Sequence, residues 1–455
     1  MGNEVVPPAE SAVRLVAAGV VRIPAGLVRA GKTAPDDVAP GGDRSEVIKD
    51  TTSPFNPGKP VDLELFVGRL PEIERLRAKA RAAMTGRLEA AFITGERGIG
   101  KSSLASFVGH LCEKHDGALS VHVMLGGIDT LENVVRAVFD QLVKNSTERP
   151  FLDRVKEFLG NRVTEAGLFG VSIKFEPQEE DLRVLVNNFV PSIAALTEQL
   201  RPDRDGLVII LDDLNGIVQS PRFADWIKSF VDEVSTSQRR VPLCLVLVGL
   251  EERRHMMIEQ NPSVGRIFEV IDVRPWDRDE TRIFYANAFA KVGIAVEDSA
   301  WPVLQDYTGG LPALAHEIGD AAFRVDEDGL VDKADALKAV VLAADVVGSK
   351  YLEPQVIRAI RSKKYRDILR KLALTRAFGG RELASFSRAE LKKISHDSEK
   401  KVVDSFLRRM KSLDVIVEAP EEGRGRYRFA RQLDCLYFVM EGIKASKRGG
   451  DEDKD

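Results

Sequence analysis

The chain has 455 residues, of which 44% are hydrophobic and 30% charged, and its formal net charge is −4. The length predicts two or three domains, and the composition is that of a globular protein rather than a disordered or fibrous one. The three cysteines, Cys112, Cys244 and Cys435, form no C-x-x-C pair, which suits a reducing compartment and argues against a zinc site. No apolar stretch is long enough to span a bilayer, so we expect a cytoplasmic protein with no membrane partner.

Turn-forming residues dominate residues 1–60, which we interpret as a flexible N-terminal arm and linker. An α/β core follows over 61–275, because apolar, strand-like runs alternate with helical patterns there. The runs are 91–94, 120–125, 207–211, 243–248 and 268–273. This alternation is typical of a parallel sheet covered by helices on both faces. Within it, residues 168–175 alternate like a small hairpin, with helices expected near 151–164 and 179–200.

The rest of the chain is predicted to be mainly helical. A helical lid is expected over 276–350. Residues 351–445 then show two short helices, a longer one at 400–411, and two extended segments at 414–418 and 426–429. Helices followed by such a hairpin indicate a winged-helix domain. The last ten residues, 446–455, are strongly charged, and we expect a disordered tail.

The most informative motif is a complete phosphate-binding loop of the Walker A type, G-x-x-x-x-G-K-S, between a strand-like run and a helical one. Its glycines let successive backbone N–H groups point at phosphate oxygens, and the helix N-terminus adds its dipole. Lys101 is expected to reach the β- and γ-phosphates, and the Ser102 hydroxyl to hold Mg²⁺. The chain is therefore predicted to bind a nucleoside triphosphate through Gly95, Glu96, Arg97, Gly98, Ile99, Gly100, Lys101, Ser102 and Ser103.

Two carboxylates end the apolar run Leu207–Leu211. Asp212 is expected to bind the metal through water, and Asp213 to orient or deprotonate the attacking water, since phosphoryl transfer depends on positioning and charge stabilisation. Two acidic residues after a strand are also common turn formers. Together with the phosphate loop they predict an ATPase that converts ATP and water to ADP and phosphate.

The segment Phe66–Leu76, which reads FVGRLPEIERL, resembles the entry segment of AAA+ ATPases of the origin-recognition type, shared by the related STAND signalling ATPases. Asn56-Pro57-Gly58 and Gly310-Leu311-Pro312 match the same pattern. The resemblance implies ATP and Mg²⁺ as cofactors, a P-loop NTPase sheet of order 5-1-4-3-2, a helical lid and a C-terminal winged helix. It also implies adenine contacts from the backbone of Phe66, Val67, Gly68 and Arg69, and closure of Pro312 over the base or ribose.

The sequence departs from the family in three places. Leu247–Leu250 offers no polar side chain where the family has a polar sensor, Ala313 replaces the arginine that many members carry in the lid, and the acidic pair is Asp-Asp. These departures favour slow hydrolysis and a nucleotide switch over a motor.

An arginine finger is the remaining expectation. Arg266 stands where AAA+ proteins place a finger that reaches the γ-phosphate of a neighbouring subunit, although it could instead be a solvated arginine that caps a helix. Arg253 and Arg254 are weaker candidates for the same role. The six histidines are interpreted as ordinary core or surface residues, with no metal implied.

Positive charge is concentrated near the C-terminus. Residues 356–431 contain 21 Lys or Arg and 10 Asp or Glu, a difference of +11, so the remainder sums to −15. Such a patch could attract DNA phosphates, or it could be the solvated surface of a domain that packs on the nucleotide fold.

The leading hypothesis is an ATP-binding, slowly hydrolysing oligomeric switch that works with an unidentified protein partner in a multiprotein system such as bacterial defence or signalling. The alternative is a DNA-binding AAA+ ATPase of the origin-recognition or transposition-regulator type. A small-molecule kinase is disfavoured, because it explains neither the lid nor the winged helix.

Overall fold

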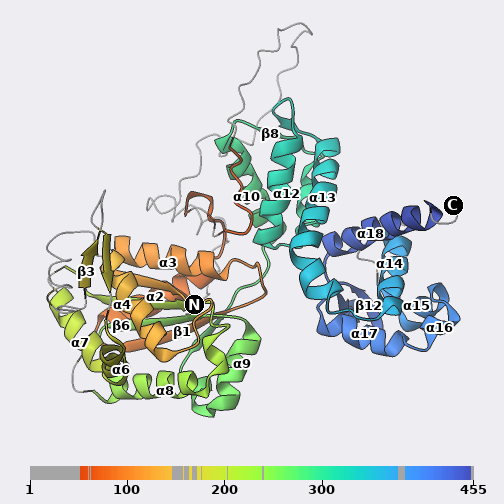
Figure 1. Cartoon of the computed structure of the whole chain (residues 1–455). Helices are drawn as coiled ribbons and strands as arrows, with labels where there is room; N and C mark the ends of the chain where they lie inside the picture. Colours follow the sequence, from red (N-terminus) through yellow and green to blue (C-terminus); the bar gives the residue numbers. More distant parts are fainter. Residues whose placement is uncertain are drawn as a thin grey trace, which may run out of the picture. The chain divides into compact units, whose positions relative to one another are not determined.

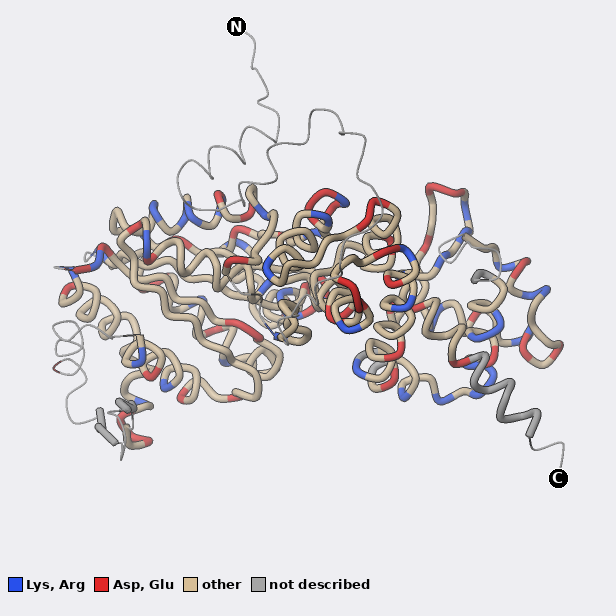
Figure 2. Tube along the Cα trace, turned by 90° about the horizontal axis from the view of Figure 1, so that it is seen from above, with Lys and Arg blue, Asp and Glu red and all other residues tan. Residues whose placement is uncertain are grey.

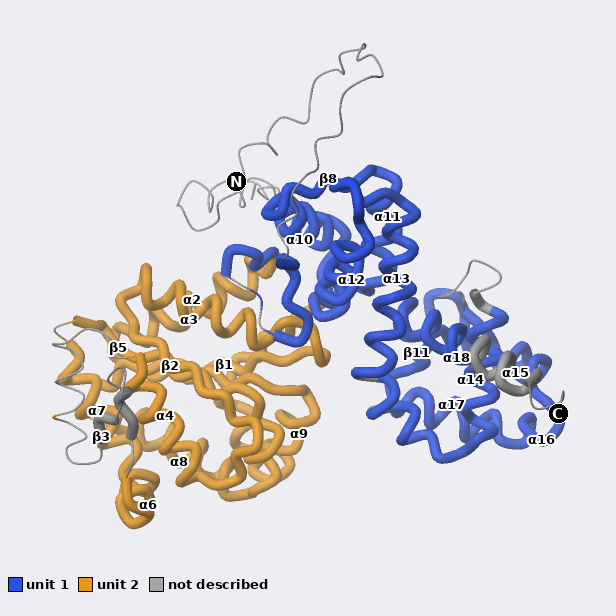
Figure 3. Tube along the Cα trace, turned by 45° about the horizontal axis from the view of Figure 1, so that its top comes forward, with its two compact units in different colours: residues 1–67, 275–455 blue, residues 68–274 orange. Residues whose placement is uncertain are grey.

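The computed structural model describes residues 52–59, 61, 63–145, 157, 163–166, 172–175, 177–201, 203–237, 240–377 and 385–451. The chain forms two compact units, residues 68–274 and residues 1–67 together with 275–455 (Figure 3). No helix among the described residues combines the length and apolar character needed to cross a membrane.

A five-stranded parallel sheet forms the centre of the unit 68–274 (Figure 1). Its strands, in spatial order, are β2 (Ala118–Met124), β5 (Gly206–Asp212), β6 (Leu243–Val248), β1 (Leu88–Thr94) and β7 (Glu269–Asp272). Counted along the chain, this is the order 2-3-4-1-5, so the expected P-loop NTPase sheet is confirmed.

Alternation along each strand places two hydrophobic layers on the sheet. On β5, Leu207, Ile209 and Leu211 face the core formed with the helices α4, α6, α7 and α8. Val208 and Ile210 point to the other face, where α3 packs so closely that a Cβ on Gly109 would lie 3.2 Å from Ile210. Strands buried on both faces have continuous apolar sequences, which explains why they could be predicted from the sequence.

The helices of this unit are α2 (Leu70–Met84), α3 (Lys101–His115), α4 (Leu131–Asn145), α6 (Glu179–Asn187), α7 (Phe189–Leu200), α8 (Pro221–Thr236), α9 (Glu251–Gln260) and the 3₁₀ turns η3 (Ile217–Gln219) and η4 (Pro262–Arg266).

The insertion between the second and third core strands differs in detail from the expectation. The antiparallel hairpin is present, but its strands are β3 (Val163–Ala166) and β4 (Ser172–Phe175), so the end of the expected helix 151–164 belongs to a strand. Apart from residue 157, the rest of that expected helix lies outside the described residues. The expected helix 179–200 is interrupted at Asn188, which separates α6 from α7.

The second unit begins its described part at residues 52–59, which were expected to belong to a flexible linker. Phe55 is only 3% exposed and meets the rings of Phe284, Tyr285 and Phe289 edge-on. A Cβ at Gly319 would lie 2.3 Å from the Phe55 ring, so only glycine leaves room for it. Burying a large aromatic ring outweighs the entropy of fixing these few residues, so this stretch is packed and the linker prediction is wrong for it.

Residues 276–350 are largely helical, as expected. The elements are α10 (Arg278–Lys291), α11 (Trp301–Asp306), α12 (Pro312–Val325) and α13 (Lys333–Val347), with a short parallel pair, β8 (Ala295–Val296) and β9 (Leu330–Val331). A capping box of Asp277 and Glu280 starts α10. A π-helical segment, η5 (Gly348–Ile357), follows α13 directly.

The C-terminal elements surround a separate hydrophobic core. They are α14 (Lys363–Ala377), β10 (Phe386–Ser387), α15 (Arg388–Ile394), α16 (Asp397–Lys400), α17 (Val403–Ser412), β11 (Ile416–Glu418), η6 (Pro420–Glu422), β12 (Arg426–Phe429) and α18 (Gln432–Asp451). The strands β11 and β12 form the expected antiparallel hairpin, and β10 adds a third strand beside β12.

The expected disordered tail is wrong over 446–451, because α18 continues to Asp451. Its first part is fixed by buried residues such as Leu433 and Phe438. Once a helix is nucleated in this way, extending it costs little.

Candidate nucleotide site

The phosphate loop connects the end of β1 to the start of α3, at the carboxyl edge of the sheet. Three of its glycines, Gly95, Gly98 and Gly100, have positive φ values of 143°, 82° and 93°. A Cβ at Gly95 would also lie 2.7 Å from the Val273 carbonyl oxygen. Only glycine adopts these conformations without strain, so the loop is built for close approach of backbone N–H groups to a ligand. No side chain caps α3 at Gly100, which leaves the helix N-terminus suited to an anion.

Lys101, the first residue of α3, folds back over this loop. Its Nζ donates to the carbonyl oxygens of Gly95 at 2.9 Å and Glu96 at 2.7 Å. Burial lowers the pKa of Lys101, whereas the Asp212 carboxylate opposes this effect by raising it. The lysine and Asp212 are therefore within electrostatic reach of each other, as a phosphate-binding cation and a metal-binding carboxylate must be.

The side chain of Arg69 is hydrogen-bonded to the phosphate loop. Its guanidinium is buried and donates to the carbonyl oxygen of Ile99 at 3.2 Å and to that of Arg274. Gly68 and Arg69 both have positive φ values, 71° and 64°. The side chain of Arg69 thus braces the phosphate loop, a role that the expected backbone contact with adenine did not include.

Asp212 ends β5 on the face of the sheet that α3 covers, and it is buried. Its Oδ1 accepts from the backbone N–H of Asp213 at 2.7 Å, and its Oδ2 lies 3.0 Å from Nε2 of His122. The register brings this histidine close, because β2 pairs with β5 so that His122 stands beside Ile210. The interpretation of His122 as an ordinary residue therefore missed its contact with the metal-binding candidate.

Asp213 leaves the strand in the left-handed region, with φ 57°. Its Oδ1 accepts a hydrogen bond from Asn215 Nδ2, and Asn215 Oδ1 accepts from Arg253 Nε at 3.1 Å. A Cβ at Gly126, in the loop after β2, would lie 2.8 Å from Asp213 Oδ2. Asn215 and Gly126 are parts of this site that the sequence motifs did not identify, and Arg253, considered only as a weaker finger candidate, contacts the chain's own site instead.

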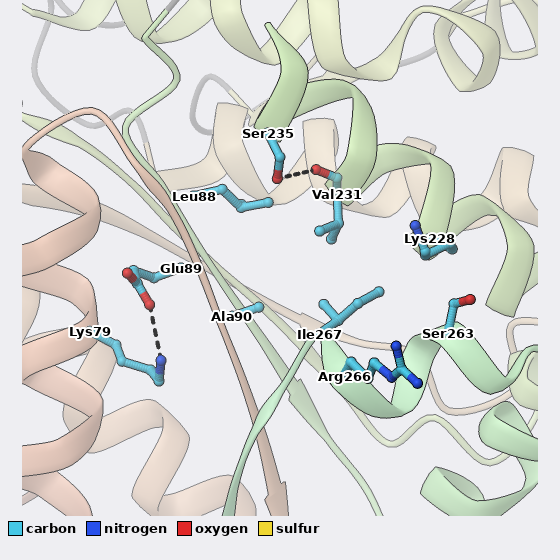
Figure 4. Close-up of a pocket in the computed structure, with 10 residues that line it drawn as sticks. All are labelled: Lys79, Leu88, Glu89, Ala90, Lys228, Val231, Ser235, Ser263, Arg266 and Ile267. Atoms are coloured by element: carbon cyan, nitrogen blue, oxygen red, sulfur yellow. Dashed lines mark hydrogen bonds and ion pairs between the residues drawn. The ribbon is translucent and has the colours of Figure 1, made fainter.

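Arg266 lies at the opposite edge of the sheet. It ends η4, directly before β7, where the parallel strands begin, and it lines a cavity of about 520 Å³ with Leu88, Glu89 and Ala90 at the start of β1 (Figure 4). Lys79 in the same cavity is paired with Glu89 at 3.0 Å. Arg266 is exposed, and no ion pair or hydrogen bond engages its side chain within the described part of the chain. It is therefore separated from the chain's own phosphate loop by the length of the strands.

The remaining candidates fall into two groups. Arg254 is paired with Glu251 of the same helix and is engaged locally. Phe66, Val67 and Pro312 belong to the other compact unit, with Pro312 as the first residue of α12, so their contacts with base or ribose stay predictions.

The residues present fit a magnesium ion shared with a nucleotide. No group of three or more His, Cys, Asp or Glu side chains among the described residues could enclose a metal. Mg²⁺ prefers oxygen ligands and is commonly held by one or two carboxylates plus substrate phosphates and water. The hydroxyl of Ser102 and the carboxylate of Asp212 supply that kind of donor set.

The sheet order and the phosphate loop are those of the P-loop NTPase fold. Residues 65–246 match the family model described as AAA ATPase domain, so the chain contains such a domain. None of the curated proteins compared matches the chain.

Among solved structures, the chain is similar to the ORC2 protein of Aeropyrum pernix in complexes with ADPNP and ADP. The TM-score is 0.54 at 16% identity, over 89% of this chain and 98% of that one. A Walker-type ATPase of Pyrococcus abyssi matches at 18% identity and a TM-score of 0.48, over 82% and 96%. The ORC1 protein of A. pernix in complex with DNA matches at 15% identity and a TM-score of 0.41, over 84% and 96%. The similarity to the ORC2 protein shows a shared fold.

Proposed function

We propose that this protein is a magnesium-dependent ATPase that works as a nucleotide-operated, oligomeric switch. The observation that carries the proposal is the convergence of Lys101 and Asp212 at one edge of the sheet, next to a loop of positive-φ glycines. The ORC2 protein with the same fold was captured with ADPNP and ADP, which supports an adenine nucleotide as the ligand. Lys101 would bind the terminal phosphates, Ser102 and Asp212 would hold Mg²⁺, and Asp213 would take a proton from the attacking water.

Self-association is the second part of the proposal. Arg266 lies at the sheet edge opposite the chain's own phosphate loop, yet it is exposed and has no carboxylate partner among the described residues. An arginine in this place could serve the γ-phosphate of a second copy of the chain, where it would stabilise charge in the transition state. Slow hydrolysis is a finer part of this proposal, and it rests on the apolar Leu247–Leu250 segment, on Ala313 in the lid and on the Asp-Asp pair. Work with a protein partner in defence or signalling is a further part, and it rests on the resemblance to STAND ATPases.

The proposal is tested by nucleotide binding and assembly in solution. Titration with a fluorescent ATP analogue, phosphate release, and light scattering with ADP and then with ADPNP should show binding, turnover and a larger mass with ADPNP. Lys114→Ala is a matched control, because this exposed lysine lies on α3 but far from the loop. A wild-type protein that binds no ATP would refute the ATPase proposal. A protein that hydrolyses ATP but remains a monomer with ADPNP would refute self-association.

A DNA-binding role is the alternative, and one specific observation favours it. Arg358, Arg361 and Arg409 line a cavity of about 580 Å³ together with Tyr365. Arg358 and Arg361 are exposed and have no ion pair within the described ranges. Lys and Arg recur along these C-terminal elements, with acidic residues between them (Figure 2). Unpaired cations beside an aromatic ring suit a phosphate backbone, and we infer that α14 to β12 form the winged helix that would present them.

The hairpin itself contributes less than expected to such a surface. Arg426 donates to Ser385 and pairs with Glu390, and Arg428 lies 3.7 Å from Glu421. If DNA binds here, Arg358→Ala combined with Arg361→Ala should weaken binding and reduce its salt dependence by about one unit of slope for each phosphate that these arginines neutralise. Arg388→Ala removes an exposed arginine that is paired with Asp404 and is the control. No binding by the wild type at low salt would remove the alternative.

A further inference from the structure

The end of β6 lacks a polar side chain, but a polar group reaches the same place from α9. Arg253 is the third residue of α9, and its Nε donates to Asn215 Oδ1 at 3.1 Å across 38 residues of sequence. Asn215 in turn donates from Nδ2 to Asp213 Oδ1. The three side chains, which we call the Asp213 relay, form one hydrogen-bonded line from α9 to the end of β5.

The relay fixes which oxygen of Asp213 is available. Oδ1 is occupied by the Asn215 amide, whereas Oδ2 faces the loop after β2, where a Cβ at Gly126 would lie 2.8 Å away. The backbone N–H of Asp213 is held by Asp212 Oδ1 at 2.7 Å. With its backbone in the left-handed region and one oxygen engaged, the carboxylate has a defined orientation.

The first turn of α9 also borders the phosphate-binding lysine. Burial is the main influence on the pKa of Lys101 and lowers it, and the carboxylate of Glu252 is among the groups that raise it. Glu252 and Arg253 are consecutive, so the start of the helix that carries the relay's guanidinium is within electrostatic reach of Lys101. Arg254, the next residue, is turned to Glu251 instead, with Nε to Oε1 at 3.0 Å.

We propose that Arg253 is a positioning residue for ATP hydrolysis, acting through Asn215 to hold the Asp213 carboxylate in place. This inference rests on the proposed ATPase function. In the step concerned, the water oxygen bonds to the γ-phosphorus and the bond from that phosphorus to the β–γ bridging oxygen breaks. ADP leaves with the bridging oxygen, and Asp213 Oδ2 accepts the water's proton before releasing it to solvent. A guanidinium held by an amide thus takes the place of the absent polar residue at the end of β6.

The test compares Arg253→Ala, Asn215→Ala and the double variant in steady-state turnover and in ATP titration. Each single change should lower kcat by roughly tenfold, below the full contribution of a general base. KM and the Kd for ATP should stay within about twofold, because Lys101 and the loop are untouched. Since both residues act on one carboxylate oxygen, the double variant should lose no more than the worse single variant.

A conservative variant separates positioning from general damage. Arg253→Lys, which retains a cationic donor, should recover part of kcat. Arg254→Ala is the control, because it removes an arginine from the same turn without touching the relay, and it should leave kcat unchanged.

Multiplicative losses in the double variant, no recovery of kcat in Arg253→Lys, or an equal loss in Arg254→Ala would overturn the relay while leaving the ATPase intact. A wild-type protein that binds and hydrolyses no ATP would instead overturn the proposed function and the relay together.

Discussion

The two edges of the central sheet differ in how completely their charged groups are engaged within the chain. At the carboxyl edge, Lys101 donates to its own loop, Asp212 meets His122, and Asp213 is held by Asn215. At the amino edge, Arg266 is exposed and has no partner among the described residues. We therefore propose that one edge binds nucleotide within a single chain, whereas the arginine at the other edge acts on a second molecule.

The largest expected effect comes from removing the central cation of the carboxyl edge. Lys101→Ala should eliminate measurable ATP binding, because it takes away charge-assisted hydrogen bonds worth about 1.5–3 kcal/mol each. Titration calorimetry measures this directly, with Lys114→Ala as the control. Unchanged affinity would show that the loop does not bind the phosphates.

The comparison is tested most sharply by Arg266→Ala. ATP affinity should be unchanged, because the carboxyl edge is complete, but turnover should fall by about 10³-fold or more if the arginine acts on a neighbour. Adding a Lys101→Ala protomer, which retains Arg266, should restore part of the activity in a mixed assembly. Normal turnover in the single variant, or no rescue on mixing, would make Arg266 structural and the two edges independent.

A smaller effect is expected from Asp213→Asn, which keeps the shape of the side chain but removes the base. Turnover should fall by roughly 10²-fold while Mg·ATP stays bound through Asp212. Light scattering should then show the ADPNP-like assembly persisting with ATP. An unaltered rate of phosphate release would assign the water-positioning role to another residue.

The smallest of these effects should come from Gly126→Ala. The added methyl would lie 2.8 Å from Asp213 Oδ2, so the carboxylate must shift, and we expect a loss of roughly tenfold in kcat with unchanged ATP affinity. A thermal unfolding curve serves as the control for folding. A normal kcat would mean that the carboxyl edge tolerates movement of Asp213.

Much of this fold could be predicted from the sequence because its strands are buried on both faces. The runs at 91–94, 207–211 and 243–248 are recognisable by their continuous apolar residues, and the phosphate loop is a local motif. The order of the strands came from the resemblance to known ATPases and is confirmed. The packed state of residues 52–59 could not be predicted from the sequence. The contacts of Phe55 with helices distant in sequence outweigh the turn-forming composition of that segment.

The site was predicted only where it is local. The contact between His122 and Asp212 joins residues 90 positions apart, and it depends on the register of β2 against β5. The contact between Arg253 and Asn215 depends on where α9 begins. A sequence motif specifies only the spacing of residues along the chain, so it could not predict either of these two contacts.

The placement of Arg266 would link the ATPase activity per chain to the number of chains in an assembly. If Arg266 serves a second copy, as proposed, a donor edge and an acceptor edge on opposite ends of one sheet favour head-to-tail contact, which closes into a ring or continues as an open filament. In a ring every nucleotide site receives an arginine. In an open row one terminal site does not, so turnover per chain would rise with the length of the row, and activity would report the number of joined molecules.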